Sequence, residues 1–373
     1  MATWEWIATD LRTNALLGEL PLSGVSFGEV LNGAGQFSAT LNALDGVTAT
    51  TAAERRRLIA LRRAASTPGR TVVWPRRDGV VFPPFIVWQR EGGDGTSTYQ
   101  LSGAGLWSYF RTQHLRVTKT YTGTDQLAIA RDLIATAQAA SGANIGVTLG
   151  AETSGVFRDR TYRSFELKQI GEAVEQLAAV DDGFDFAIDA TPSFGRVLTL
   201  SYPRRGRIAG TTGIVFEQGK NLMSYRWSAD AARQANIYTA IGAGDGDDML
   251  LATASRPELL DAGFPLLSAT GSFKDVNRQA TLNAHALAGV NARANTPTFF
   301  SLTVDPDDTD AGVGSWIVGD DALLVIADDD DYPRQADGSP GYRAFHRILS
   351  YTANVPAEGK DTITVELGEA IAA

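Results

Sequence analysis

The stretch VGDDALLVIADDDDYPRQADGSPGYRAF, residues 318–345, holds two apolar runs separated by a loop that begins with four consecutive aspartates. The first run is residues 323–326, and the second begins at the end of the stretch and continues over 345–351. Asp, Gly and Pro bound both runs, and Asp and Gly tolerate the backbone angles that turns require. The stretch therefore predicts an antiparallel hairpin with strands over 318–326 and 345–351.

The four aspartates leave three interpretations open, namely a metal site, an acid/base pair and a solvated hairpin tip. They are Asp328, Asp329, Asp330 and Asp331. Carboxylates buried together without a cation would repel one another, and adjacent acids at a turn are ordinarily solvated. We expect this loop to be exposed and to bind no metal.

Length and composition limit the classes of protein to which the chain can belong. It has 373 residues, a formal net charge of −10 and no cysteine. That length indicates two to four domains. The absence of cysteine excludes disulfides and thiolate chemistry. No apolar stretch approaches the roughly 20 residues that cross a bilayer, and the N-terminus lacks a signal-peptide pattern, so we expect no membrane span and assembly in a cytoplasm.

The negative charge argues against a protein that holds nucleic acid tightly. Phosphate recognition depends on Lys and Arg, which release counterions when they bind. An acidic surface would still suit a channel through which DNA slides without sticking.

The first 115 residues alternate strand-like runs with turn signals, which predicts a β-barrel-like domain. Turns are expected at residues 12–14, 32–35, 77–79 and 92–95. One short helix is expected near 52–66, with Leu58, Ile59 and Leu61 as an apolar stripe and a solvated basic face.

Residues 116–205 predict an inserted α/β module with two helices and two later strands. We expect Thr124 to cap the first helix and Ser164 to cap the second. The apolar face of the first helix is Leu127, Ala130, Ile134 and Ala137. The apolar face of the second is Leu167, Ile170, Val174 and Leu177.

After residue 205 the β pattern returns around one long helix, expected over 274–294. We expect segments 206–262 and 296–373 to form a second β-barrel-like domain, and 263–295 to be a helical insertion. The expected fold class is α+β, mainly β. It comprises two related β-barrel-like domains, an inserted α/β module and a long helix in the second half.

A second aspartate-rich stretch superficially resembles a calcium loop. It contains Asp305, Asp307, Asp308 and Asp310. Counted from its first aspartate, the sixth position, which should be Gly, is Asp310, and the twelfth, which should be Glu, is Trp316. The calcium-loop pattern therefore fails.

No motif supports catalysis or a cofactor. The three histidines, His114, His285 and His346, lie in separate segments without catalytic or metal-ligand spacing. The stretch GAGDGDD, residues 242–248, contains Asp245, Asp247 and Asp248. It lacks the Lys-Ser/Thr of a phosphate loop, so we expect a hairpin tip. No GxSxG motif is present, and sequence alone cannot place a glycosidase carboxylate pair. We predict no catalytic residue, cofactor or metal.

Six stretches carry a resemblance through their order along the chain. They are SGVSFGEVLNGAGQFSATLNAL (23–44), YQLSGAGLWSYFRTQHL (99–115), FELKQIGEAVEQLAAVDDGFDFAID (165–189), NLMSYRWSADAARQANIYTAIGAG (221–244), WIVGDDALLVI (316–326) and YRAFHRILSYT (342–352). In this order the chain resembles the tail hub proteins of tailed bacteriophages (baseplate hub or tail-associated minor tail proteins), which are similar to the hubs of contractile injection systems.

The resemblance implies a structural protein of the virion, a homotrimeric ring at the distal end of the tail tube. Each subunit would give two related tube domains, so that six domains match the sixfold tube. The ring would adapt the tube to the tail tip and line the DNA channel without binding DNA specifically. Its other partners would be distal tail or tube proteins, the tape measure, and tail-tip or receptor-binding proteins.

On this hypothesis the protein is located at the virion tail tip after assembly in the host cytoplasm. The acidic loops at 245–248 and 328–331 would lie at the rim or face the lumen. Hydrolase activity in such hubs usually resides on a C-terminal extension, and this chain ends at Ala373, just after its last strand. We therefore expect no enzyme.

The alternative is a carbohydrate-binding or glycan-cleaving tail protein acting on the host cell surface. It is suggested by abundant carboxylates and seven tryptophans: Trp4, Trp6, Trp74, Trp88, Trp107, Trp227 and Trp316. Most of them alternate within strand-like runs, which favours packing in a core over a sugar-binding platform. Three exposed coplanar tryptophans would favour the alternative.

Overall fold

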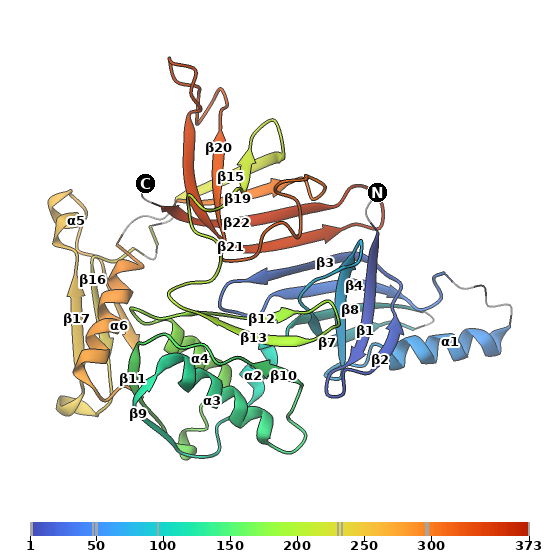
Figure 1. Cartoon of the computed structure of the whole chain (residues 1–373), viewed down its shortest axis with the longest axis horizontal. Coiled ribbons are helices and arrows are strands. Elements are labelled where there is room, and N and C mark those ends of the chain that lie inside the picture. Colours follow the sequence, from blue (N-terminus) through green and yellow to red (C-terminus); the bar gives the residue numbers. More distant parts are fainter. Residues whose placement is uncertain are drawn as a thin grey trace.

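The computed structural model shows a mainly β protein with helices on the outside of its sheets (Figure 1). The expected class, α+β and mainly β, is confirmed. The structure describes residues 3–46, 48, 51–94, 97–229, 231–232, 234–294 and 298–371. Over these residues, no helix is both long and apolar enough to cross a membrane.

The first part of the chain builds half of a large sheet. Its strands are β1 (Trp4–Asp10), β2 (Leu16–Glu19), β3 (Leu22–Val30), β4 (Gln36–Asn42), β5 (Thr71–Arg77), β6 (Val80–Val81), β7 (Phe85–Gly92) and β8 (Thr98–Gly105). The predicted turn between β5 and β6 is present. Its residues Asp78 and Gly79 have φ of 47° and 85°, values that suit Asp and Gly in a tight hairpin.

The last part of the chain builds the other half. Its strands are β14 (Val215–Glu217), β15 (Leu222–Ala229), β19 (Thr298–Val304), β20 (Asp321–Ile326), β21 (Tyr342–Val355) and β22 (Thr362–Ile371). The predicted hairpin is confirmed, because β20 pairs antiparallel with β21 from Asp321 opposite Arg347 to Ile326 opposite Tyr342.

Strand β21 joins the two halves into one sheet (Figure 1). Its first part pairs with β20, and its second part pairs with β3, from Ser350 opposite Val30 to Val355 opposite Val25. Its other edge pairs with β22. We call the β3–β21 pairing the seam. Within the described ranges, fourteen strands therefore belong to one sheet.

The barrel-like closure that we expected is not observed, because none of the sheets in the described part of the chain closes into a barrel. The physical reason lies at the seam. Strand β3 pairs with β4 on one side and with β21 on the other, so it is not free to close a barrel with the first eight strands. The large sheet instead stays open, with β15 and β2 at its two ends.

One hydrophobic core runs along the large sheet and crosses the seam. Trp6, Phe27 and Phe85 from the first half share it with Phe300 and Ile348 from the second. Phe27 lies edge-on to the Tyr351 ring, with centroids 6.4 Å apart. Burial of aromatic area on this scale is a dominant stabilising contribution, so the two halves stabilise each other.

The inserted module covers the other face of the first-half strands. Its elements are α2 (Trp107–Thr112), β9 (Lys119–Asp125), α3 (Gln126–Ala139), β10 (Val147–Leu149), β11 (Phe157–Tyr162), a 3-10 turn η1 (Ser164–Glu166), α4 (Ile170–Ala178), β12 (Asp185–Ala190) and β13 (Arg196–Ser201). Leu133 and Val174 of its helices share a second core with Trp74 and Ile86 of the sheet. Strand β5 is consequently buried on both faces.

Both predicted helix caps in this module were wrong. Asp125, not Thr124, caps α3, because its Oδ1 accepts hydrogen bonds from the backbone N–H groups of Leu127 (2.9 Å) and Ala128 (3.3 Å). Helix α4 begins at Ile170 rather than after Ser164. Leu167 has φ 46° and ψ 41°, a left-handed conformation that ends the 3-10 turn and separates it from the helix.

Residues 237–291 form a further small unit at one end of the molecule (Figure 1). It contains β16 (Ile237–Ile241), a 3-10 turn η2 (Gly246–Asp248), β17 (Leu251–Ser255), α5 (Pro257–Asp261), β18 (Ser268–Ser272) and α6 (Gln279–Asn291). Tyr238 and Leu282 are the centre of its own core. Helix α6 is the predicted long helix, but it is shorter at both ends than the expected 274–294.

The predicted short helix is α1 (Ala52–Ala64), at the opposite end of the molecule (Figure 1). Thr51 and Glu54 form a capping box, with Thr51 Oγ1 accepting from Glu54 N at 3.2 Å and the Glu54 carboxylate accepting from Thr51 N at 3.0 Å. The apolar stripe that we predicted is present in the sequence but does not enter a core, since α1 has no buried residue.

Candidate functional site

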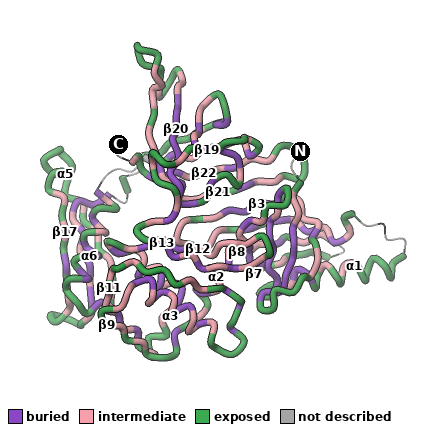
Figure 2. The backbone as a smooth tube through the Cα atoms, in the orientation of Figure 1, coloured by how far each residue is buried: buried purple, intermediate pink, exposed green. Residues whose placement is uncertain are grey.

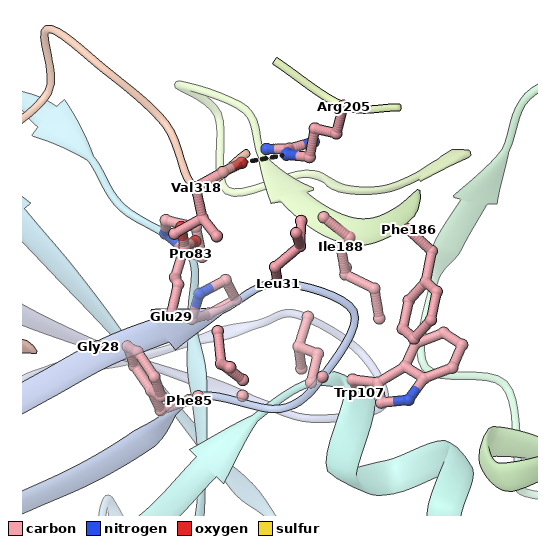
Figure 3. Close-up of a pocket in the computed structure, with 17 residues that line it drawn as sticks. Gly28, Glu29, Leu31, Pro83, Phe85, Trp107, Phe186, Ile188, Arg205 and Val318 are labelled. Atoms are coloured by element: carbon pink, nitrogen blue, oxygen red, sulfur yellow. Dashed lines mark hydrogen bonds between the residues drawn. The ribbon is translucent and has the colours of Figure 1, made fainter. Parts of the chain in front are cut away.

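The inserted module rejoins the large sheet through an arginine-rich segment, residues 202–210. Arg205 forms two hydrogen bonds with Asp189 of β12, Nη1 to Oδ2 at 2.8 Å and Nη2 to Oδ1 at 2.6 Å. Its Nε donates to the backbone oxygen of Val318 at 3.1 Å, the dashed line in Figure 3. Burial alone would lower the pKa of Arg205, but the hydrogen bonds and charge of Asp189 outweigh it and raise that pKa.

Two further arginines of this segment bind the two aspartates at the start of β20, Asp320 just before the strand and Asp321 as its first residue. Arg204 forms two hydrogen bonds with Asp321, and Arg207 binds Asp320, with Nη2 to Oδ2 at 2.6 Å and Nε to Oδ2 at 3.1 Å. The side chains of both aspartates are only 1% exposed. Such a carboxylate is tolerated in the interior because it is paired, and removal of its partner leaves an uncompensated buried charge.

A fourth ion pair connects the network to the seam strand. Arg347 of β21 donates to Asp185 of β12, which also accepts hydrogen bonds from the backbone N–H of Arg205 at 2.7 Å and from Asn32 Nδ2 at 2.8 Å. We call these groups the junction network: Asp185, Asp189, Arg204, Arg205, Arg207, Asp320, Asp321 and Arg347. It fixes the inserted module, the start of β20 and strand β21 relative to one another.

Two cavities border the junction network. The smaller has a volume of about 50 Å³ and is lined by Leu31, Trp107, Phe186 and Ile188, with Arg205 and Val318 at one side (Figure 3). The larger, about 500 Å³, lies between the β5–β6 hairpin, strands β12 and β13, and residues 313–317. Its lining mixes apolar side chains with a few polar groups, as small-molecule sites do.

Glu29 of β3 lines both cavities. Its pKa is raised to about 7, because burial disfavours the carboxylate and Asp189 adds to the effect, while attraction to Arg205 offsets it only in part. Among the described residues, none donates a hydrogen bond to this carboxyl group. Glu29 is thus the one acid beside the network that titrates near neutral pH in the described part of the chain.

The acidic loop at 328–331 is exposed, as predicted, except at Asp328, which is half-buried, and its own carboxylates also hold it in place. Asp328 accepts a hydrogen bond from the Tyr225 hydroxyl and from the backbone N–H of Tyr332 at 2.7 Å, and these bonds lower its pKa. Asp331 accepts from Trp227 Nε1 at 2.6 Å. Asp329 and Asp330 lie in water. The loop is therefore attached to strand β15 by two of its four acids.

The other predicted acidic loop lies elsewhere in the molecule. Asp245, Asp247 and Asp248 are exposed in the connection between β16 and β17, which is a hairpin as predicted. The two loops belong to different sheets, so the structure does not combine them into one site.

The three histidines likewise lie in separate environments. His346 is buried, with Nδ1 2.8 Å from the Gly368 oxygen and Nε2 2.8 Å from the Tyr342 hydroxyl. His285 stacks on Phe273 with ring centroids 3.9 Å apart. Burial, with help from neighbouring arginines, lowers the pKa of His285 to about 3. His114 is exposed.

In the stretch 305–310, Asp305 and Asp308 bind backbone groups and Asp307 pairs with Arg77. Asp305 Oδ1 accepts from the N–H of Asp307 at 3.0 Å, and Asp308 Oδ1 accepts from the N–H of Ala311 at 2.7 Å. Over the residues that the structure describes, no three His, Asp or Glu side chains gather as a metal site would require.

Five of the seven tryptophans contribute to packing. Trp6, Trp74, Trp107 and Trp316 are buried, and Trp4 stacks on Trp6 with centroids 5.5 Å apart. The other two are partly exposed, and each uses its indole N–H within the chain: Trp88 donates to Ser108 at 2.8 Å and Trp227 to Asp331. The prediction of packing over a sugar-binding platform is thus confirmed for most of them.

The sequence interpretation missed the junction network, because it read Asp320 and Asp321 only as the boundary of an apolar run within the predicted strand 318–326. The available signal was the density of arginine in YPRRGR, residues 202–207, and of acid in GDD, residues 319–321. The two stretches are separated by more than a hundred residues, so neither identifies the other as its partner.

Neither a protein-family model nor a curated protein sequence matches the chain, whereas several solved structures do. The tail protein from Neisseria meningitidis MC58 aligns with TM-score 0.62 over 98% of this chain and 96% of its own length, at 14% identity. The 43 kDa tail protein of prophage MuSo2 from Shewanella oneidensis aligns with TM-score 0.60 over 97% of this chain and 98% of its own length, at 10% identity.

A third similar structure is a component of the Escherichia coli type VI secretion system that is itself described as structurally similar to bacteriophage T4 tail proteins. It aligns with TM-score 0.51 over 95% of this chain and 76% of its own length, at 7% identity. These similarities establish a shared fold. The chain has the fold of bacteriophage tail proteins and of this secretion component, as the order of its sequence stretches predicted.

Proposed function

We propose that the chain is a structural tail protein that forms a homotrimeric hub ring at the distal end of a tail tube. In this role it adapts the tube to the tail tip and lines the channel for DNA. The observation that carries the proposal is the extent of the structural match, which covers both halves of the large sheet, the inserted module and the small end unit rather than one common domain.

The proposal assigns a role to each part of the chain. Residues 1–115 form the first tube domain, and the strands of segments 206–262 and 296–373 that belong to the large sheet form the second; the seam holds the two side by side. The module at 116–205 and the small end unit, residues 237–291, are insertions outside the tube. The junction network keeps the module in a fixed orientation, as a ring subunit requires.

The acidic loops fit the same role. The loops at 245–248 and 328–331 are exposed, and the chain as a whole carries a charge of −10. We place these loops at the rim or toward the lumen, where clustered carboxylates deny DNA phosphates a partner. The other partners in this proposal are distal tail or tube proteins, the tape measure and tail-tip proteins. The role is structural and requires no catalysis.

Labelling of intact particles tests the proposed location. An antibody raised against the purified protein is applied to tailed particles from the bacterium that encodes it, and the label is located by electron microscopy. We expect label at one position, the end of the tail distal to the head. Label along the tube or on the head would contradict the proposal, as would particles that lack the protein by mass spectrometry. Particles from a strain without the gene are the control.

A further inference from the structure

Helix α1 projects from one end of the molecule (Figure 1) and buries none of its residues (Figure 2). Among the described residues, hydrogen bonds join its C-terminal end to the large sheet, where Arg62 donates to the backbone oxygen of Glu19 and Arg90 donates to the Ser66 oxygen at 3.1 Å. A helix of 13 residues is marginal in water unless one face packs against something. Within the described residues, the helix therefore has little of the packing that would ordinarily stabilise it.

The surface of α1 is both basic and apolar. It contains Arg55, Arg56, Arg57, Arg62 and Arg63 against the single acid Glu54, a net charge of +4 in a chain of −10. Leu61 lies three residues after Leu58 and four after Arg57, so it shares a face of the helix with each of them, and Leu61 is 56% exposed. In the described structure, Arg55, Arg56 and Arg57 form no ion pair. We call residues 52–64 the α1 arm.

At the opposite end of the longest axis lies a surface of complementary character (Figure 1). Residues 257–266, helix α5 and the loop after it, expose Leu260, Phe264 and Leu266, the last by 67%. They also contain Glu258 and Asp261; Glu258 pairs with Arg256, just before the segment, at 3.3 Å, so residues 256–266 carry a net charge of −1. We call this segment the α5 lobe. Exposed apolar side chains with a charged rim mark interaction sites.

We propose that the α1 arm of one subunit docks on the α5 lobe of a second copy of this chain. The inference rests on the proposed ring and names the surfaces that close it. Both surfaces combine exposed leucines with charge, and the charges are opposite. The arm cannot reach its own lobe, because the two lie at opposite ends of the molecule (Figure 1). A contact between two different surfaces is heterologous, and heterologous contacts generate closed rings when the rotation permits.

Cross-linking tests the contact directly, because the chain contains no cysteine of its own. A variant with Leu61→Cys and Leu260→Cys is treated with a short bismaleimide and analysed by denaturing electrophoresis. We expect covalent dimers and trimers and no larger species. Each single variant should stay monomeric on the gel. The matched control combines Leu61→Cys with Val117→Cys, a residue that is equally exposed (50%) but outside the lobe; it should give no ladder.

Charge reversal gives an independent measurement. Arg55→Glu with Arg56→Glu and Arg57→Glu should weaken self-association at least tenfold in Kd, measured by sedimentation. Adding Glu258→Arg and Asp261→Arg should restore it. The control reverses three exposed arginines elsewhere, Arg116, Arg163 and Arg334, which changes the net charge equally and should leave the Kd unchanged.

The outcomes separate this inference from the function on which it rests. A trimeric wild type without the cross-link, or with a Kd insensitive to the reversal, overturns the docking of arm on lobe and leaves the ring intact. A monomeric wild type overturns both. The arm substitutions could also weaken association that the lobe substitutions then fail to restore. That result would indicate another binding surface for the α1 arm and would also contradict the inference.

Discussion

At the scale of single residues, the burial of carboxyl groups beside the junction network should have the largest effect on stability. Glu29 and the junction network lie in one region, yet their carboxyl groups differ in their partners. Each carboxylate of the network is paired with a guanidinium, whereas Glu29 faces the cavities without a donor among the described residues. Glu29 should therefore make the stability of the fold depend on pH.

Glu29→Gln should stabilise the protein at pH 8 and have no effect near pH 4. The pKa of Glu29 is about 7 in the folded protein against an ordinary value of 4.5, so protonation favours the fold. The stabilisation that comes from protonated Glu29 is complete below about pH 4.5 and is lost as the pH rises through 7. We expect a gain on the order of 1 kcal/mol at pH 8, measured by thermal unfolding across this range.

The control for this measurement is Glu358→Gln at an exposed position, which should change stability at neither pH. A gain from Glu29→Gln that does not vary between pH 4 and 8 would contradict the assignment of the titration to Glu29.

Asp321→Asn should destabilise the fold by about 3 kcal/mol, because it leaves Arg204 without its buried partner. The comparable change Asp329→Asn, at an exposed position, should stay within about 0.5 kcal/mol of the wild type. Urea unfolding measures both. In a double-mutant cycle with Arg204→Gln, the two losses should be strongly non-additive; simple additivity would show that the pair is not coupled.

At the scale of elements, local patterns were predictable and long-range pairings were not. The β20–β21 hairpin and the turn at Asp78–Gly79 follow from contiguous residues, and both are present. The seam joins residues that are more than three hundred positions apart, and no local signal predicts it. The same holds for the junction network. The predicted start of α4 was wrong because Leu167 adopts a left-handed conformation that its apolar character does not suggest.

Gly28→Ala should disrupt the seam. Gly28 lies opposite Thr352. A Cβ there would lie 1.9 Å from the backbone oxygen of Tyr351, so the strands would have to separate. We expect a loss of at least about 2 kcal/mol by urea unfolding. Gly213→Ala is the matched control, since its Cβ would meet open space. Equal stability of the two variants would mean that the close strand contact at Gly28 is not required.

Replacement of Asp328, Asp329, Asp330 and Asp331 by Asn should leave folding and assembly intact. Asn retains an oxygen that accepts the hydrogen bonds from Tyr225 and Trp227. The melting temperature of the wild type should not depend on calcium. A large rise in the melting temperature of the wild type on addition of calcium, absent in the variant, would show instead that the loop is a metal site.

At the scale of the whole molecule, the continuous sheet and the unpartnered ends both suit a subunit of a larger assembly. The large sheet ends in open edges at β15 and β2, and open edges are sites where further chains pair. The α1 arm and the α5 lobe add two exposed surfaces that a lone chain leaves unused. The fold class was predictable from the order of strands and helices, whereas the open sheet and these end surfaces depend on tertiary packing.

The mass of the purified protein in solution, measured together with a low-resolution image of the particles, tests the proposed ring most directly. A homotrimeric hub predicts a species of three times the 39.8 kDa chain mass and particles with a central opening. A monomer at all concentrations, or an assembly without threefold closure, would contradict it.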